Sequence, residues 1–274
     1  MRLTNGIRAV AMCPALRRSL VAGFSAIALV AFGPLAKANL IQNGSFESTS
    51  LSNSGPFVAS GTGAAVLSAV ADWYVDCAAA AAHACSTADP DLTLVFPGTG
   101  TTNYGYNNDA LYMGTPPNTM PATSPDGGNF VAADGDPNYS APFFQTISGL
   151  TAGQTYTLTF YQAAAQQVGL SGPTTEQFEV TLGSQIQYST LMTNPSEGFT
   201  PWNQQTMTFT ATSASEVLTF LSLGAPGGAP PLGLLDGVSL NPPSPPPAST
   251  PEPSGLALIG IGAGIIALRR LQRK

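Results

Sequence analysis

The sequence predicts an all-β protein built as a β-sandwich. Short apolar segments recur between turns rich in Gly, Pro, Asn and Ser, and in several of them apolar and polar residues alternate. Alternation with a period of two is typical of strands that bury one face. Amphipathic helical patterns are almost absent from residues 39–241. About ten short strands of this kind favour two packed antiparallel sheets.

The N-terminal segment 1–38 has the features of a secretory signal peptide. An arginine-rich start precedes a largely apolar run over 19–35, and Ala36-Lys37-Ala38 forms a small-x-small cleavage site. We therefore expect signal peptidase to remove this segment and the mature chain to begin at Asn39.

The first half of the mature domain is predicted to hold short strands separated by long loops. Residues 39–47 form a strand that breaks at Asn43-Gly44, and residues 66–75 form another around Trp73. A short apolar strand follows at 92–96. The segment 97–128 is dense in Gly, Pro, Asn and Thr, which indicates a long surface insertion with little regular structure.

The second half shows the clearest strand pattern. From Gln154 to Ala163, large apolar residues alternate with threonines, which predicts one buried and one exposed face. The segment 216–223 is apolar enough for both of its faces to be covered. Two strands, at 129–132 and 143–147, are predicted on either side of a turn at Asp134-Gly-Asp136. Further strands are predicted at 178–182, 186–192, 206–211 and 234–240.

The C-terminal segment 251–274 follows a Pro-rich linker over 242–250 that favours a stiff polyproline spacer. It consists of Pro251-Glu252-Pro253, an apolar run over 256–268, and a basic end. This order resembles the PEP-CTERM sorting signal of Gram-negative bacteria. The resemblance implies a single transmembrane sorting helix, transient residence in the inner membrane, and processing by an exosortase near the Pro-Glu-Pro triplet. A plain C-terminal membrane anchor is the alternative.

The charge distribution excludes one class of partner. All nine Lys and Arg residues lie at positions 2–37 or 269–274, whereas 14 of the 15 acidic residues lie between Glu47 and Asp236. The domain at 39–241 therefore carries a formal charge of −14, compared with −6 for the whole chain. Because it has no cation to contact phosphates, we expect no nucleic-acid binding.

The domain at 39–241 also resembles a known family. Residues 39–47 (NLIQNGSFE), 149–160 (GLTAGQTYTLTF) and 234–240 (LLDGVSL) look like the opening, a middle strand and the ending of galactose-binding-like jelly rolls, including choice-of-anchor and DUF642-type domains. The resemblance implies a jelly-roll β-sandwich. It departs from the family at Gly237, where Asn or Asp is frequent, and in the insertion 97–128.

Calcium is the one cofactor that we expect. In jelly rolls of this class a structural Ca²⁺ commonly sits where the first and last strands meet, and the resemblance places Glu47 and Asp236 there. Carboxylate oxygens are the ligands that Ca²⁺ prefers. The alternative is that Asp236 caps a turn and Glu47 is solvated. Asp134 and Asp136 form a second candidate pair, for which a simple turn is the alternative.

The insertion holds the candidate carbohydrate-binding residues. Aromatic rings stack on the apolar face of a sugar, while amide and carboxylate groups bond its hydroxyls. The alternative is that the tyrosines pack the insertion onto the sandwich. The candidates are Tyr104, Tyr106, Asn108, Asp109 and Tyr112.

Two cysteines remain in the mature domain, Cys77 and Cys85. In an exported chain such a pair predicts a disulfide, with two free thiols as the alternative. No catalytic motif accompanies the single histidine, so we expect no enzyme.

The sequence thus predicts an exported protein of the cell surface or extracellular matrix. Its expected role is structural or adhesive and associated with exopolysaccharide. The alternative is a carbohydrate-binding module that resembles a lectin and depends on Ca²⁺.

Overall fold

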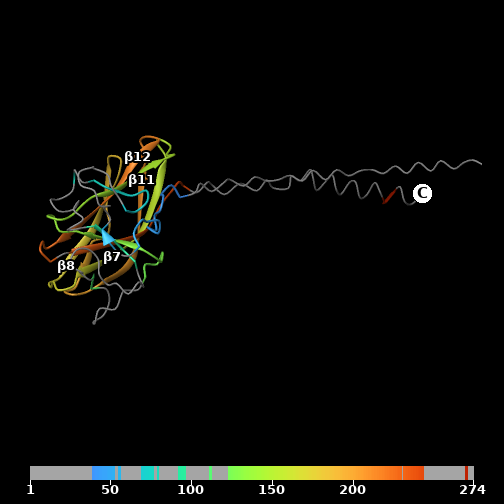
Figure 1. Cartoon of the computed structure of the whole chain (residues 1–274). Helices are drawn as coiled ribbons and strands as arrows, with labels where there is room; N and C mark the ends of the chain where they lie inside the picture. Colours follow the sequence, from blue (N-terminus) through green and yellow to red (C-terminus); the bar gives the residue numbers. More distant parts are fainter. Residues whose placement is uncertain are drawn as a thin grey trace, which may run out of the picture. The chain divides into compact units, whose positions relative to one another are not determined.

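The computed structural model describes residues 39–52, 55–56, 69–76, 79, 92–96, 111–112, 123–229, 231–243 and 269–270. Contacts between Cα atoms divide the chain into Met1–Leu35, which lies outside the described residues, and Ala36–Lys274. Within the described part of Ala36–Lys274, two antiparallel sheets face each other (Figure 1). No helix in the described ranges is long and apolar enough to cross a membrane.

Seven strands form the sheet that we call sheet I. Its order is β1-β3-β5-β13-β7-β11, and β4 pairs with the far end of β7. The strand bounds are β1 (Gly55–Pro56), β3 (Leu92–Val95), β4 (Leu111–Tyr112), β5 (Phe130–Asp134), β7 (Thr155–Gln167), β11 (Thr200–Thr210) and β13 (Pro231–Asn241).

Six strands form the opposite sheet, sheet II. Its order is β10-β8-β12-β6-β2, and β9 continues the edge position of β10 beside β8. The strand bounds are β2 (Tyr74–Val75), β6 (Phe143–Ser148), β8 (Thr174–Leu182), β9 (Gln185–Tyr188), β10 (Met192–Asn194) and β12 (Ser215–Ala225). The prediction of an all-β sandwich is therefore confirmed.

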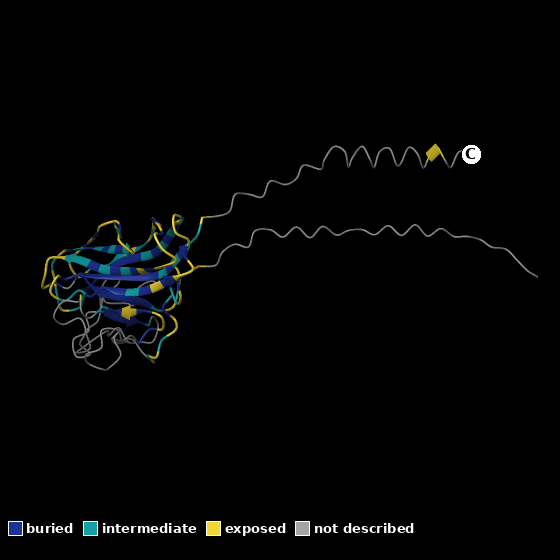
Figure 2. Ribbon diagram, turned by 90° about the horizontal axis from the view of Figure 1, so that it is seen from above, coloured by how far each residue is buried: buried dark blue, intermediate teal, exposed yellow. Residues whose placement is uncertain are grey.

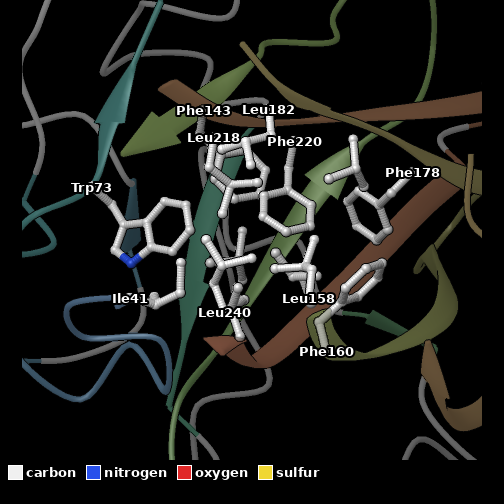
Figure 3. Close-up of a cluster of buried hydrophobic side chains, with 14 of the residues drawn as sticks. Ile41, Trp73, Phe143, Leu158, Phe160, Phe178, Leu182, Leu218, Phe220 and Leu240 are labelled. Atoms are coloured by element: carbon white, nitrogen blue, oxygen red, sulfur yellow. The ribbon is translucent and has the colours of Figure 1, made fainter. Parts of the chain in front are cut away.

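The core lies between the two sheets because each long strand turns its large apolar residues inward. Strand β8 alternates strictly between buried and half-buried positions, and Figure 2 shows the buried residues concentrated on the strands. Phe220 is at the centre of the aromatic cluster, with ring centroids 5.3 Å from Phe160, 5.7 Å from Phe143 and 6.1 Å from Trp73. Figure 3 shows these side chains meeting between the sheets.

The N-terminal segment is not the strand that the sequence predicts. Residues 39–48 form bends and turns, with positive φ at Asn43 and Phe46. The side chain of Asn43 makes the hydrogen bonds that strand pairing would otherwise supply. Its Nδ2 donates to the carbonyls of Ser48 and Ala71, each at 2.9 Å, and its Oδ1 accepts from Ser48 N at 2.9 Å. The Asn43 carbonyl also accepts from Trp73 Nε1 at 2.9 Å. This side-chain network docks the segment onto the core.

Other predicted strands change in extent. Strand β7 runs four residues beyond Ala163, and β11 begins at Thr200 rather than 206. The strand expected at 66–75 is reduced to Tyr74–Val75 in the described residues, because a turn with φ 66° at Asp72 interrupts it. The strand expected at 186–192 is divided into β9 and β10.

Glutamine side chains join the outer edges of the two sheets. Gln185 on β9 donates from Nε2 to the Thr210 carbonyl at 2.6 Å and accepts from Thr210 N at 3.1 Å. Gln187 Nε2 donates to the Thr208 carbonyl at 2.5 Å. Strand β11 pairs only with β7 in its sheet, so these amides satisfy backbone groups on its free side. We call Gln185 and Gln187 the edge glutamines.

Candidate functional site

The predicted calcium residues lie at one place on the outer side of sheet I, which we call the acidic corner (Glu47, Asp126 and Asp236). Asp236 lies on β13, where the register shifts, and is fully buried. Its Oδ1 accepts from Gly237 N at 2.7 Å, whereas its buried Oδ2 has no hydrogen-bond partner. Burial raises the pKa of Asp236 to about 8, and the charges of Asp126 and Glu47 add to this rise, while Ser124 and Gly237 oppose it.

Two glycines allow the chain to approach these carboxylates. A Cβ atom on Gly128, where φ is 68°, would lie 1.8 Å from Glu47 Oε1. That oxygen accepts from Asn129 N at 2.5 Å. A Cβ atom on Gly237, where φ is 60°, would lie 2.9 Å from Tyr161 Cδ2 and 3.1 Å from Asp126 Cβ. The departure from the family pattern at Gly237 therefore has a steric reason.

The acidic corner brings Glu47 and Asp236 together electrostatically, as the resemblance implies, but not as a complete ligand set. Among the described residues, no three His, Cys, Asp or Glu side chains form a group that could hold a metal ion. The buried and unpartnered Asp236 Oδ2 is the atom that fits a cation best, because an uncompensated buried carboxylate is costly.

The second candidate pair, Asp134 and Asp136, is a structural turn. Asp134 Oδ1 accepts from Asp136 N at 2.7 Å. The Asp136 carboxylate accepts from Asn138 N at 2.9 Å and from Gly228 N at 2.5 Å, so it joins two loops. Burial tends to raise the pKa of Asp136, but these backbone hydrogen bonds hold it below its usual value. These carboxylate oxygens thus accept hydrogen bonds from backbone N–H groups, which favours a structural turn over a metal site.

Glu176 is a buried carboxyl that the sequence does not mark as special. It lies on the inward face of β8, where the Thr174 hydroxyl donates to its Oε1 and Oε2 has no partner. Burial raises its pKa to about 7, while the Thr174 hydrogen bond opposes the rise. The hydroxyl of Ser222, also inward, has no hydrogen-bond partner either. As the sequence predicts, Glu179 faces the other side of the strand and is only half-buried.

Among the described residues, exposed aromatic and apolar side chains gather on the outward face of sheet II, which we call the open face. One row of paired residues crosses five strands, so it spans roughly 19 Å at a strand spacing of about 4.8 Å. Its members, from β2 to β9, are Tyr74, Phe144, Thr219, Thr181 and Ile186. A second row pairs Leu221, Glu179 and Tyr188.

Exposure marks the open face as unusual. Five large hydrophobic residues in the described ranges are exposed, and four of them, all but Leu191, lie on this face: Tyr74 (39%), Val217 (41%), Ile186 (55%) and Tyr188 (56%). The rings of Tyr74 and Phe144 lie 5.9 Å apart. The prediction that both faces of 216–223 are covered is thus wrong for β12, because Val217 projects outward and is exposed.

The outward face of sheet I differs, because its centre is buried. A second apolar cluster lies there, with Trp202 packed edge-on against Phe130 at 5.3 Å. The sequence could not separate the two outward faces, since both consist of apolar and hydroxyl-bearing residues. The members of this cluster are Val95, Phe130, Ala132, Ala163, Ala165, Leu232 and Leu234, with Phe199 and Trp202 against them.

Several predicted site residues lie outside the described ranges. These are Tyr104, Tyr106, Asn108 and Asp109 of the insertion, the cysteines Cys77 and Cys85, and the triplet Pro251, Glu252 and Pro253. Tyr112 is described in its backbone, which pairs with Gln166 of β7. The disulfide, the insertion site and the sorting signal therefore stay predictions.

Sequence reasoning missed Asp126 and the open face. Asp126 lies near the end of the segment 97–128, which is dense in Gly, Pro, Asn and Thr, and carries no sequence pattern of its own. For the open face a signal existed: Ile186 and Tyr188 alternate with two glutamines, which places both on one side of a strand.

No protein-family description matches the chain, and no curated protein matches it either. Several solved structures are similar to this chain at low sequence identity. TmCBM61 in complex with β-1,4-galactotriose is 15% identical, covering 76% of this chain and 100% of that chain, at a TM-score of 0.40. The N-terminal cellulose-binding domain of Cellulomonas fimi β-1,4-glucanase C is 20% identical, covering 50% of this chain and 90% of that chain, at a TM-score of 0.30. The CBM22-1 xylan-binding domain of Paenibacillus barcinonensis Xyn10C is 13% identical, covering 44% of this chain and 76% of that chain, at a TM-score of 0.28. At these TM-scores the likenesses carry no argument about this chain's fold or ligand.

Proposed function

We propose that this protein is a non-catalytic carbohydrate-binding module whose ligand lies on the open face. The observation that supports this most is the pair of exposed tyrosines, Tyr74 and Tyr188, on the same face of sheet II at its two opposite edges. Flat rings suit the apolar face of a sugar. Hydroxyl and carboxylate groups of Thr181, Thr219 and Glu179 lie between them and can bond sugar hydroxyls.

The distribution of carboxylates favours binding over catalysis. Hydrolysis of a glycosidic bond needs two carboxyl groups that flank the substrate. In the described residues, Glu176 and Asp236 have the raised pKa values that suit an acid, but both are fully buried and lie on different sheets. Glu179 is the only carboxylate in the two paired rows of the open face. Two rows with aromatic rings and a single carboxylate suit recognition rather than hydrolysis.

A glycan array on the full-length chain tests the proposal. Tyr74→Ala and Tyr188→Ala should each weaken binding about tenfold, which corresponds to ~1.4 kcal/mol. Leu191→Ala is the matched control, since Leu191 is as exposed as Tyr188 but lies in the connection between β9 and β10. Binding to no glycan refutes the function, and binding that both tyrosine variants retain in full refutes the site.

We further propose that Glu47 and Asp236 hold a structural Ca²⁺ at the acidic corner, with Asp126 beside them. Asp236 Oδ2 supports this, because this buried oxygen accepts no hydrogen bond and a bound ion would neutralise its carboxylate. Calcium should raise the melting temperature of the native chain, and Asp236→Asn should abolish that rise. An unchanged melting temperature on adding Ca²⁺ rejects the site.

We also propose that the protein is exported and acts at the cell surface or in the extracellular matrix. Signal peptidase and an exosortase would process its two ends, and an exopolysaccharide of the matrix would be the partner of the open face. The sequence supports this, because all nine cationic residues lie at positions 2–37 and 269–274, in or beside those ends. Intact mass and cell fractionation of the native protein test both cleavages; an uncut chain in the cytoplasm contradicts them.

A further inference from the structure

Glu179 is the one charged side chain that the strands of sheet II turn outward. The other acidic residues of these strands, Glu176 and Glu216, are buried on the inward side, and the strands contain no basic residue. Across the sheet, Glu179 pairs with Leu221 of β12 on one side and with Tyr188 of β9 on the other. A single carboxylate therefore lies among the apolar and hydroxyl-bearing side chains of these strands on the open face.

The Glu179 carboxylate lies beside the exposed ring of Tyr188. Directly paired residues of antiparallel strands have Cβ atoms about 5 Å apart, and both of these side chains point outward. A hydrogen bond to Glu179, together with the charge of Glu179, raises the pKa of the Tyr188 phenol. A sugar ring that stacks on Tyr188 would therefore have its hydroxyl-bearing edge next to this carboxylate.

No lysine or arginine of the domain offsets this carboxylate. The chain has no Lys or Arg between Ala38 and Arg269, and its one histidine, His83, lies outside the described residues. With a formal charge of −14 between residues 39 and 241, the domain repels anions at long range. A second copy of the domain would meet the same repulsion, which disfavours self-association through the open face.

We propose that the open face selects neutral glycans and rejects glycans that carry uronate or sulfate groups, with Glu179 as the discriminating residue. This inference rests on the proposed carbohydrate-binding function. A neutral sugar offers O–H donors, from which a carboxylate accepts charge-assisted hydrogen bonds. An anionic group at the same place brings a second negative charge where a donor is needed. Like-charge repulsion of this kind is one way in which a site discriminates against a wrong ligand.

A glycan array of matched pairs tests the inference. Each pair consists of a neutral oligosaccharide and the same oligosaccharide with its primary alcohols oxidised to carboxylates, which changes the charge but hardly the shape. The full-length chain is applied in a detergent without charged or sugar groups, and without added divalent cations, which could bridge two carboxylates. At about 150 mM salt, the oxidised partner of each bound glycan should bind at least about tenfold more weakly, because charges in contact are only partly screened.

Variants of Glu179 locate the discrimination. Glu179→Gln keeps a hydrogen-bond acceptor and removes the charge, so the ratio of neutral to oxidised affinity should fall at least about threefold. Glu179→Asp keeps the charge and should retain most of that ratio. Glu197→Gln is the control, because it removes one charge at an exposed position between β10 and β11, and it should leave the ratio unchanged. A partial loss of folded protein affects both glycans equally and does not change the ratio.

The outcomes separate the two proposals. Equal or tighter binding of the oxidised partners by the wild-type chain overturns the selection for neutral glycans and leaves the carbohydrate-binding function standing. A ratio that Glu179→Gln leaves unchanged, or that Glu197→Gln lowers as much, overturns the role of Glu179. Binding to no glycan overturns both proposals.

Discussion

Replacing Glu176 with glutamine should stabilise the protein, and the gain should depend on pH. The side chain is fully buried on the inward face of β8, and its Oε2 has no partner. Glutamine keeps the shape and an oxygen that can accept from Thr174. It removes the negative charge, which the interior disfavours most.

The direction of this pH dependence follows from the raised pKa of Glu176. Burial moves the pKa of Glu176 from 4.5 to about 7 in the folded protein, so the folded state holds the proton more tightly than the unfolded chain does. The unfolded state alone is ionised between pH 4.5 and 7, so the wild-type protein loses stability as the pH rises through that window. Below pH 4.5 both states are protonated, and above pH 7 the loss is complete.

The magnitude comes from the same two values. One pKa unit corresponds to 1.36 kcal/mol, so a rise from 4.5 to about 7 sets a ceiling of ~3 kcal/mol. Between pH 5 and pH 7.5 the advantage of Glu176→Gln over wild type should therefore grow by ~2 kcal/mol. For a domain of this size, that is roughly 4–8 °C in melting temperature.

Urea unfolding at several pH values, in the presence of a chelator, measures this. Only the difference between variant and wild type matters, so other titrating groups cancel. Glu179→Gln makes the same change on the outward side of the same strand and reports the effect of removing a charge alone. A difference that stays constant from pH 5 to 7.5 for Glu176→Gln refutes the reasoning.

Three further changes should affect stability. Phe220→Ala empties the centre of the aromatic cluster and should cost about 3–5 kcal/mol in urea unfolding, with Val217→Ala on the outward side of the same strand near zero. Asp136→Ala leaves the N–H groups of Asn138 and Gly228 without their acceptor and should cost ~2–4 kcal/mol at pH 7. Because the pKa of Asp136 is lowered on folding, that cost should shrink as the pH falls below 3.8, which acid titration of the unfolding free energy would show. Gly128→Ala forces a Cβ onto Glu47 at positive φ and should lower the melting temperature by several degrees; an unchanged value contradicts the close approach.

The strands with strict alternation were predictable from sequence, because a strand that buries one face has apolar residues at every second position. Met207 and Phe209 point inward on β11 as the pattern requires. The segment 39–47 was not predictable in the same way. Its conformation depends on Asn43, whose side chain bonds to Ser48 and to Ala71, a residue 28 positions away. Local propensity contains no information about that partner.

Of the candidate sites, one was likewise predictable from sequence and one was not. The family resemblance placed Glu47 and Asp236 near each other, and they do share one corner of the fold. The open face escaped detection because the apolar character of β12 indicates burial on both sides, and only the sheet order reveals that nothing in the described residues covers its outward side. Exposure of an apolar residue is a property of the assembled fold.

The edge glutamines have a consequence for how the domain avoids aggregation. Strands at sheet edges invite addition of a second chain, and many proteins prevent this with lysine side chains. This domain has no lysine available for that task. Gln185 and Gln187 instead occupy backbone groups of β11 at Thr208 and Thr210 with neutral amides. Because these amides are neutral, protection of this edge from added strands should not weaken with salt or pH.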